Sequence, residues 1–141
     1  MMKQQGAASI REVGERKTIL IVEDDSDTGL VLVSALEQYT LLSPLLVPNA
    51  SEALRVVRER KPDLFLLDYW LGGIDGIELA EQLHRVRGLE TVPTIVMSAA
   101  TLPFEWEEQP DTHRLALLRK PFDLDVLFET IAALLAGKHL A

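Results

Sequence analysis

Polar side chains follow four short apolar runs of this sequence, at the points where each run ends. They are Glu23, Asp24 and Asp25 after residues 18–22, Asp68 at the end of 64–68, Ser98 after 94–97, and Arg119 and Lys120 after 115–118. Carboxylates gathered around one point repel one another unless a cation joins them. Hard oxygen ligands suit Mg²⁺, which keeps several waters and shares phosphate oxygens. The residue types therefore predict a magnesium site with a hydroxyl and an ammonium group beside it.

Phosphoryl transfer is the chemistry that fits this combination. A carboxylate can act as the nucleophile and become an aspartyl phosphate. The reaction needs in-line positioning and positive charge around the equatorial oxygens, and little covalent help. Lys120 would supply charge and Ser98 a hydrogen bond. Asp68 is the best nucleophile, because it ends residues 64–68, the run that is expected to form a central strand of the fold.

Each of these residues alone also has a structural interpretation. Acids after a strand commonly favour the dipole of the next helix, and an aspartate at a strand end is commonly a turn residue. Ser98 alone would be a helix cap and Lys120 alone a surface lysine. Their joint occurrence at four run ends, in order along the chain, favours a site.

The alternation of short apolar runs with amphipathic stretches predicts the elements that position these residues. Strands are expected at 18–22, 44–47, 64–68, 94–97 and 115–118, and helices at 28–38, 50–57, 77–86 and 124–134. The expected buried face of the first helix is Leu30, Val33 and Leu36. Asn49 or Ser51 is expected to cap the second helix, and Asp123 opens the last.

Strands that alternate with helices predict a parallel sheet with helices on both faces. Pro44 would make the second strand an edge strand, because proline cannot donate to a central ladder. Ligands of such sheets bind beyond the carboxyl ends of the strands, where the polar residues are expected. Within residues 99–114, Pro103 and Pro110 leave room for at most a short helix at 104–109.

Length and charge set the limits of this interpretation. The 141 residues predict one domain at 17–137, with a loose tail at 1–16 and a short tail at 138–141. A net charge of −8 argues against direct nucleic-acid binding. No apolar run approaches the roughly 20 residues that span a bilayer, so no membrane partner is expected. The absence of cysteine excludes a thiolate metal site and fits a cytoplasmic location.

Four blocks of the sequence resemble the receiver domains of two-component response regulators. They are Ile19-Leu-Ile-Val-Glu-Asp-Asp25, Lys61-Pro-Asp-Leu-Phe-Leu-Leu-Asp68 with Asp75-Gly76, Pro93-Thr-Ile-Val-Met-Ser-Ala99, and Arg119-Lys-Pro-Phe122. The resemblance covers nearly the whole chain. It implies a flavodoxin-like α/β fold, a doubly wound five-stranded parallel sheet in the order 2-1-3-4-5, here with helix four short or irregular.

The resemblance also implies roles for the matching positions. Asp68 would accept a phosphoryl group from a histidine kinase or a phosphotransfer protein, and Ser98 and Lys120 would contact its oxygens. Such a domain is a switch and not an enzyme. The phosphoryl group favours one conformation and repacks a surface, which would be read by an output protein that the sequence does not name.

The same resemblance implies the ligands of the metal. Glu23, Asp24, Asp68 and the backbone carbonyl of Trp70 would hold Mg²⁺. Asp25 falls just after the acid pair of the family and is a weaker candidate.

Several positions depart from the pattern of the family. Leu117 stands where an aromatic residue usually lies three positions before the lysine, so the usual coupling to the hydroxyl residue does not follow. Thr112-His113-Arg114 replaces a turn of small residues. Together with Pro103 and Pro110, which shorten helix four, this predicts an unusual output face and argues against the common dimer through it. Gly72 replaces a common proline and makes its loop more flexible. Trp70 is interpreted as a partly exposed aromatic of that loop, or as a cover that slows attack by water.

Two other functions are weighed against this one. The first is a phosphatase of the haloacid-dehalogenase type, because Asp25-Ser-Asp27-Thr28 resembles its Asp-x-Asp signature with the threonine one position early. The second is a receiver fold that is no longer phosphorylated and acts only by binding. Turnover of a phosphomonoester would support the first, and failure to bind Mg²⁺ would support the second.

Overall fold

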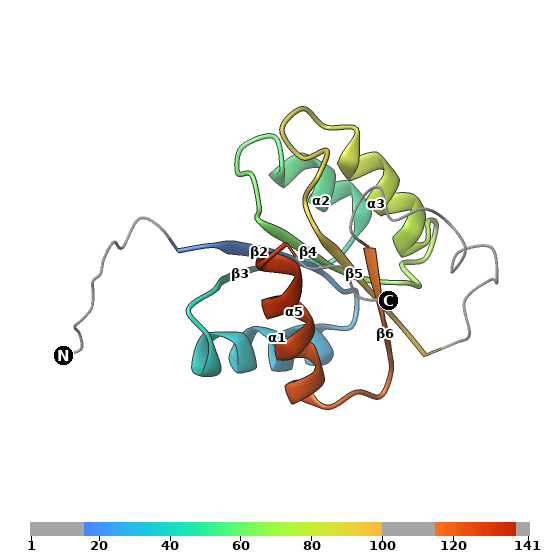
Figure 1. The fold of residues 1–141 in the computed structure, drawn as a ribbon. Helices are drawn as coiled ribbons and strands as arrows, with labels where there is room; N and C mark the ends of the chain where they lie inside the picture. The colour runs from blue at the N-terminus through green and yellow to red at the C-terminus, as the bar shows by residue number, and fades with distance from the viewer. Residues whose placement is uncertain (1–15, 100–114, 138–141) are drawn as a thin grey trace.

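The structure, a computed structural model, describes residues 16–99 and 115–137 (Figure 1). Nine elements lie along these residues: β2 Thr18–Val22, α1 Ser26–Tyr39, β3 Ser43–Val47, α2 Ala50–Val56, β4 Leu64–Asp68, α3 Gly76–His84, β5 Thr94–Ser98, β6 Leu115–Arg119 and α5 Leu124–Leu135. The short helix expected at 104–109 and the tails beyond Arg16 and Gly137 lie outside the described residues, so the domain limits stay predictions.

The five strands form one parallel sheet in the order β3-β2-β4-β5-β6. Counted along the chain this order is 2-1-3-4-5, which confirms the expected doubly wound fold. β3, which contains Pro44, is an edge strand as predicted. The register pairs Val22 with Leu67 and Asp68 with Met97, so the carboxyl ends of β2, β4 and β5 lie almost level.

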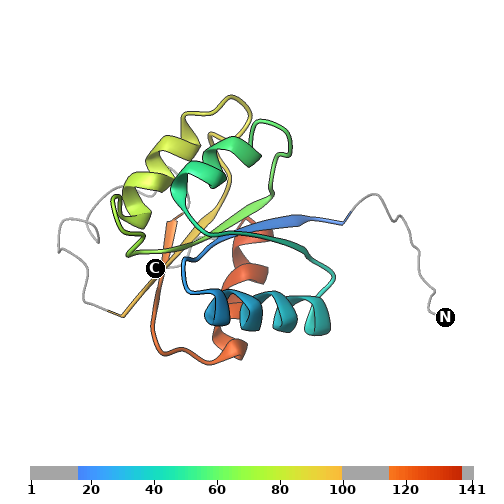
Figure 2. The ribbon, with the colours of Figure 1, turned by 180° about the vertical axis from the view of Figure 1, so that it is seen from behind.

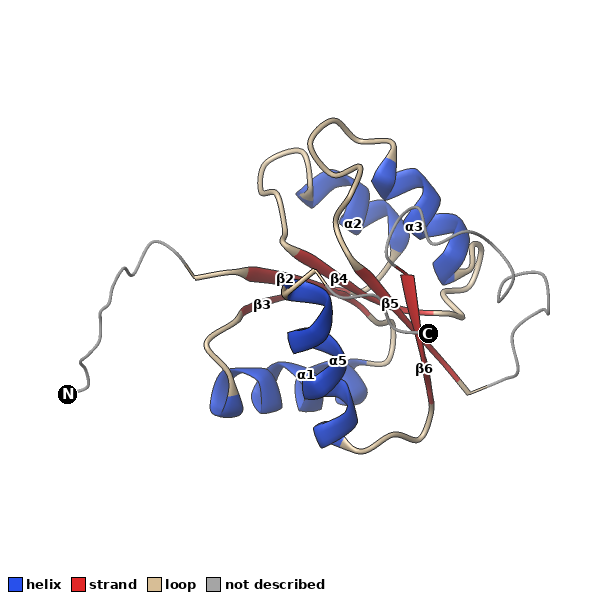
Figure 3. Cartoon of the chain, in the orientation of Figure 1, coloured by secondary structure: helices blue, strands red, loops and turns tan. Residues whose placement is uncertain are grey.

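Helices cover both faces of the sheet, with α1 and α5 on one side and α2 and α3 on the other (Figures 1, 2 and 3). Alternate residues of a strand point to opposite faces. Ile19 and Ile21 accordingly pack in the core beneath α1 and α5, and Leu20 and Val22 pack in the core beneath α2 and α3. All five residues of β4 are buried, so the strand that ends in Asp68 is held on both faces and along both edges.

The buried face of α1 differs from the prediction. Leu32 and Leu36 are buried, whereas the side chain of Leu30 is 60% exposed. Positions two apart in a helix point about 200° apart, so Leu30 and Leu32 cannot share one face. Gly29 decides between them: a Cβ there would lie 2.8 Å from a methyl carbon of Leu46, so this side of α1 packs closely on β3.

The remaining helix ends follow the sequence with small differences. Asn49, rather than Ser51, caps α2 by accepting a 2.8 Å hydrogen bond from the N–H of Glu52. Asp123 is the N-cap residue of α5, although its side chain makes no capping hydrogen bond. No helix within the described residues is both long enough and apolar enough to cross a bilayer.

The corrected face of α1 predicts unequal effects of two identical substitutions. We expect Leu32→Ala to lower the free energy of unfolding by about 2–5 kcal/mol, because it removes a buried side chain. Leu30→Ala should change it by about 0.5 kcal/mol or less, because Leu30 faces solvent. Urea unfolding of both variants measures the difference, and equal losses would contradict this orientation of α1.

Candidate functional site

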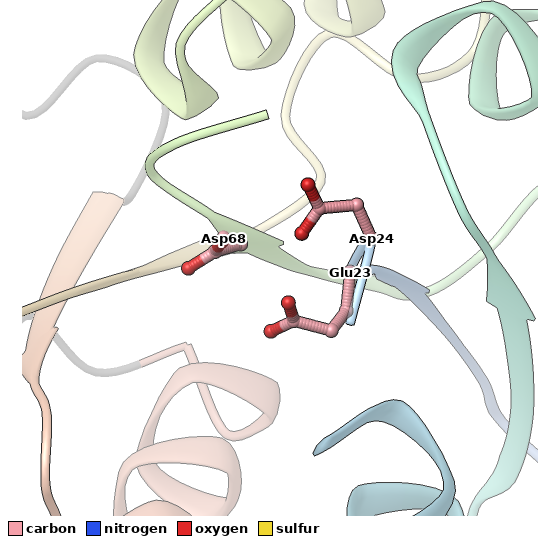
Figure 4. A group of neighbouring side chains, drawn as sticks. All are labelled: Glu23, Asp24 and Asp68. Carbon is pink, nitrogen blue, oxygen red and sulfur yellow. The ribbon is translucent and has the colours of Figure 1, made fainter. Parts of the chain in front are cut away.

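Three carboxylates meet at the carboxyl ends of β2 and β4. The N–H of Glu23 donates to the carbonyl of Val47 at 3.1 Å, which continues the pairing of β2 with β3 by one residue and holds Glu23 in line with the strand. Asp24 follows it, and Asp68 ends β4. One carboxylate oxygen from each of the three acids lies within 4.8 Å of the other two. Figure 4 shows the three side chains gathered at this edge.

Lys120 brings positive charge to the cluster from the end of β6. Its Nζ lies 2.8 Å from Oδ1 of Asp68 and 3.4 Å from Oε1 of Glu23. Its backbone N–H donates to the carbonyl of Ser98 at 2.9 Å, so the ends of β5 and β6 are joined beside the cluster. Ser98 is buried at the last position of β5. The structure therefore brings Glu23, Asp24, Asp68 and Lys120 together, with Ser98 on the neighbouring strand end.

The charges of the cluster are unbalanced. Burial raises the pKa of Glu23, and the nearby charge of Asp68 raises it further, against the opposing effects of the Asp25 N–H and of Lys120. Burial alone would lower the pKa of Lys120, but its hydrogen bond to Asp68 and the charges of Asp68 and Glu23 outweigh burial and raise that pKa. Lys120 thus contacts two of the three gathered acids, and a further cation would relieve the repulsion among them.

Asp25 has a structural role instead of a place in the cluster. It is the N-cap residue of α1, where its carboxylate accepts hydrogen bonds from the N–H of Thr28 at 3.1 Å and from the Thr28 hydroxyl. Its own N–H donates to Oε2 of Glu23 at 3.2 Å. Asp25 therefore contacts Glu23 through its backbone without being one of the three gathered acids.

The loop after Asp68 is closed at its base. The N–H of Tyr69 donates to the carbonyl of Met97, and the N–H of Gly76 donates to the carbonyl of Tyr69, both at 2.7 Å. Trp70 forms an isolated antiparallel bridge with Asp75, and its side chain is 69% exposed. This exposure agrees with the interpretation of Trp70 as a partly exposed aromatic of the loop. Asp75-Gly76, which belongs to the second of the four resembling blocks, forms the start of α3: Asp75 is the N-cap residue and Gly76 is the first residue of the helix.

A pocket of about 670 Å³ borders the cluster between α1 and the segment after β6. Lys120 lies at its edge, and its walls are largely apolar, with Val31, Leu32, Phe122 and Leu124 among the lining residues. Leu117 is half-buried on β6 and pairs with Val96. Within the described residues, a largely apolar pocket on the side of α1 thus lies next to the charged cluster at the ends of β2 and β4.

The donor atoms fit a hard divalent cation. The three gathered residues offer only carboxylate oxygens, and the group contains no histidine nitrogen or cysteine sulfur. Such a donor set favours Mg²⁺ over the softer transition metals. Asp24 is exposed, so one side of the cluster is open to water. A cation with few protein ligands and several waters suits that arrangement.

The fold and the site define a class: a doubly wound α/β domain with gathered carboxylates and a lysine at the carboxyl ends of its strands. Residues 19–132 match the family model of the response regulator receiver domain. The chain therefore belongs to the receiver domains of two-component response regulators, which are modules of phosphorylation-based signalling.

Similar proteins include longer regulators, of which this chain covers about a third, and proteins of about its own length. The phosphate regulon transcriptional regulatory protein PhoB of Pseudomonas aeruginosa is 41% identical over 85 residues, which cover 59% of this chain and 36% of PhoB. Sporulation initiation phosphotransferase F of Bacillus subtilis is 30% identical over 115 residues, which cover 80% of this chain and 89% of the relative. A two-component response regulator from Clostridium difficile is 26% identical with a TM-score of 0.75, covering 86% of this chain and 97% of that structure.

The raised pKa of Glu23 predicts how stability changes with pH in the absence of divalent cations. Its folded pKa lies above the ordinary value of 4.5, so the folded chain binds this proton more tightly than the unfolded chain. This tighter proton binding adds to the free energy of unfolding. The added stability is complete below the ordinary pKa of Glu23 and is lost as the pH rises through its folded pKa. We expect Glu23→Gln to become more stable relative to the wild type as the pH rises from about 4.5 toward neutrality.

Urea unfolding across this pH range measures the effect. Glu81→Gln makes the same chemical change at an exposed position of α3 and serves as the control. Parallel pH profiles for Glu23→Gln and the wild type would show that Glu23 does not carry this proton.

Proposed function

We propose that this receiver domain is phosphorylated on Asp68 with the help of Mg²⁺ and uses the phosphoryl group to switch a protein-interaction surface. The observation that carries the proposal is the 2.8 Å contact between Lys120 Nζ and Asp68 Oδ1, inside a cluster of three acids. A carboxylate that ends a central, fully buried strand and faces an ammonium group is fixed in position for attack. Membership of the family supports the same assignment.

The proposed step transfers a phosphoryl group between two side chains. A carboxylate oxygen of Asp68 attacks the phosphorus of a phosphohistidine on a histidine kinase or a phosphotransfer protein. The new P–O bond forms as the P–N bond breaks, and the electron pair leaves with the imidazole nitrogen. Lys120 neutralises charge on the phosphoryl oxygens, and the hydroxyl of Ser98 donates a hydrogen bond to one of them.

The metal is assigned to the remaining acids. Glu23, Asp24 and Asp68, with the backbone carbonyl of Trp70, are the proposed protein ligands of Mg²⁺. When bound, the ion supplies positive charge to the equatorial oxygens of the phosphoryl group. Glu23 and Asp24 repel an incoming phosphate in its absence, so we expect phosphorylation to depend on it.

The output of the switch is proposed to be a protein surface. For a nearly complete reversal of the two conformations, the phosphoryl group must favour one by about 5.5 kcal/mol. Lys120 and Ser98 are joined by a backbone hydrogen bond of 2.9 Å. A pull on either side chain therefore acts on the ends of both β5 and β6. We infer a cytoplasmic signalling role, with neither nucleic acid nor membrane as a direct partner.

The two alternatives receive different support. A phosphatase of the haloacid-dehalogenase type would need Asp25 and Asp27 as its acidic pair. Asp25 is instead engaged with Thr28 as the cap of α1, and Asp27 lies in the first turn of that helix. A receiver fold that only binds partners stays the alternative to be tested, and it would leave the contact between Asp68 and Lys120 as a purely structural ion pair.

If Asp68 is the phosphoacceptor, replacing its carboxylate with an amide should abolish phosphorylation of the protein. We expect acetyl phosphate with Mg²⁺ to form a hydroxylamine-sensitive phosphorylated species, detected by intact-mass spectrometry, and Asp68→Asn to abolish it. Beryllofluoride with Mg²⁺ should shift the amide NMR signals of Asp68, Ser98 and Lys120 in the wild type only, because it mimics the aspartyl phosphate.

Asp75→Asn is the matched control, because it makes the same change at a carboxylate seven positions along the chain, and asparagine also caps helices well. It should keep phosphorylation. A wild-type protein that is folded but gives neither the adduct nor the NMR shifts would overturn the proposed function and favour the module that only binds.

A further inference from the structure

Gly76 stands against the backbone of the phosphoacceptor. A Cβ built on Gly76 would lie 2.6 Å from the carbonyl oxygen of Asp68, 3.1 Å from Cα of Tyr69 and 3.2 Å from the carbonyl carbon of Asp68. All three are backbone atoms, which cannot rotate away as the end of a side chain can. The first residue of α3 is therefore in direct contact with the end of β4.

Position 76 needs a glycine because there is no room for a side chain, and not because of its backbone angles. The glycines with positive φ within the described residues are Gly72, Gly88 and Gly137, and Gly76 is not among them. An L-amino acid could adopt the backbone angles of Gly76, but its Cβ could not be accommodated. Gly73, three positions earlier in the same loop, also lacks a positive φ, and a Cβ added to it would have nothing within 4 Å.

Displacement at Gly76 would pass to the loop of Trp70. β4 is paired on both sides, and its last residue Asp68 is in register with Met97 of β5. α3 is anchored by the buried residues Leu79, Ala80 and Leu83. The strand and the helix are thus both held, whereas Gly72 and Gly73 at the tip of the loop are exposed. The hydrogen bond from Gly76 to Tyr69 and the Trp70–Asp75 bridge are the contacts left to give way.

We propose that Gly76 is a positioning residue for the phosphorylation site: its missing side chain lets the first turn of α3 clamp the backbone of Asp68 and Tyr69, and thereby fixes the carbonyl of Trp70. The inference rests on the proposed function for its consequence, because Trp70 is a proposed metal ligand there. The clamp itself is a property of the fold and can be measured without any ligand.

The test compares Gly76→Ala with Gly73→Ala, which adds the same methyl group to open space in the same loop. We expect Gly76→Ala to weaken Mg²⁺ binding about 10-fold, the smaller end of the effect of removing support from a metal ligand. It should also speed hydrogen exchange at the amides of residues 69 and 76. Gly73→Ala should keep the wild-type Mg²⁺ affinity and the slow exchange. Amide NMR with a Mg²⁺ titration gives both readouts on one sample.

The outcomes separate the clamp from the proposed function. A folded Gly76→Ala protein with wild-type affinity and wild-type exchange at residues 69 and 76 overturns the clamp. A loss of stability alone, without a change in either readout, assigns Gly76 to packing and also overturns it. If the wild type gives no Mg²⁺ shifts, the proposed function fails, and the exchange rates of the two variants still decide whether the clamp exists.

A second pair of variants covers the case in which Gly76→Ala does not fold. Oε1 of Glu78 accepts the N–H of Asp75 at 3.0 Å, and Oδ1 of Asp75 accepts the N–H of Glu78 at 2.8 Å. Glu78→Ala loosens this first turn without adding an atom at position 76, and Glu81→Ala removes the same charge one turn later. We expect faster exchange at residue 76 in Glu78→Ala only, and identical exchange in the two variants would overturn the clamp.

Discussion

Repulsion among three acids at one edge of the sheet is the constraint on which the rest of the structure depends. One carboxylate oxygen of each acid lies within 4.8 Å of the other two, and Lys120 is the cation that contacts two of the acids within the described residues. Folding brings these charges together because the strands that carry them are parallel and almost level at their ends. The hydrophobic cores on the two faces of the sheet supply the free energy that holds this arrangement, and the site retains its attraction for a cation.

The three acids of the site differ in how far they are exposed to solvent, and this difference separates a fixed buried pair from one open carboxylate. Glu23 is 3% exposed and Asp68 is 8% exposed, whereas Asp24 is open to solvent. A buried carboxylate is costly unless it is paired, and Lys120 pairs with the two that are buried. Asp24 needs no such partner. The buried pair is therefore held in a fixed geometry, and the open side can admit water, a cation or a phosphodonor.

Most of the fold and the gathered acids followed from the sequence, and the differences have physical causes. The charged residues at the ends of the expected strands can be recognised in the sequence. Because the strands of a parallel sheet end at one edge, the topology alone placed four of them together: Glu23, Asp24, Asp68 and Lys120. The face of α1 could not, because Leu30 and Leu32 are equally apolar and the close approach of Gly29 to Leu46 selects between them. Asp75-Gly76 falls in the second resembling block, but Gly76 had no predicted role, because the lack of space for its side chain arises from the close approach of α3 to β4, which a single sequence does not reveal.

The glycines of the loop after Asp68 divide two tasks between them. Gly72, with φ of 95°, lets the tip of the loop turn, and Gly76 lets its base close on the strand. A loop that is free at its tip but clamped at its base allows little movement of Asp68 toward α3. β2 and β5 hold the sides of β4, so a pull that begins at Asp68 acts most readily through Lys120. Among the described strands, β6 is an edge strand with one neighbour. Its end therefore resists such a pull least, and the proposed switch should be read out on that side.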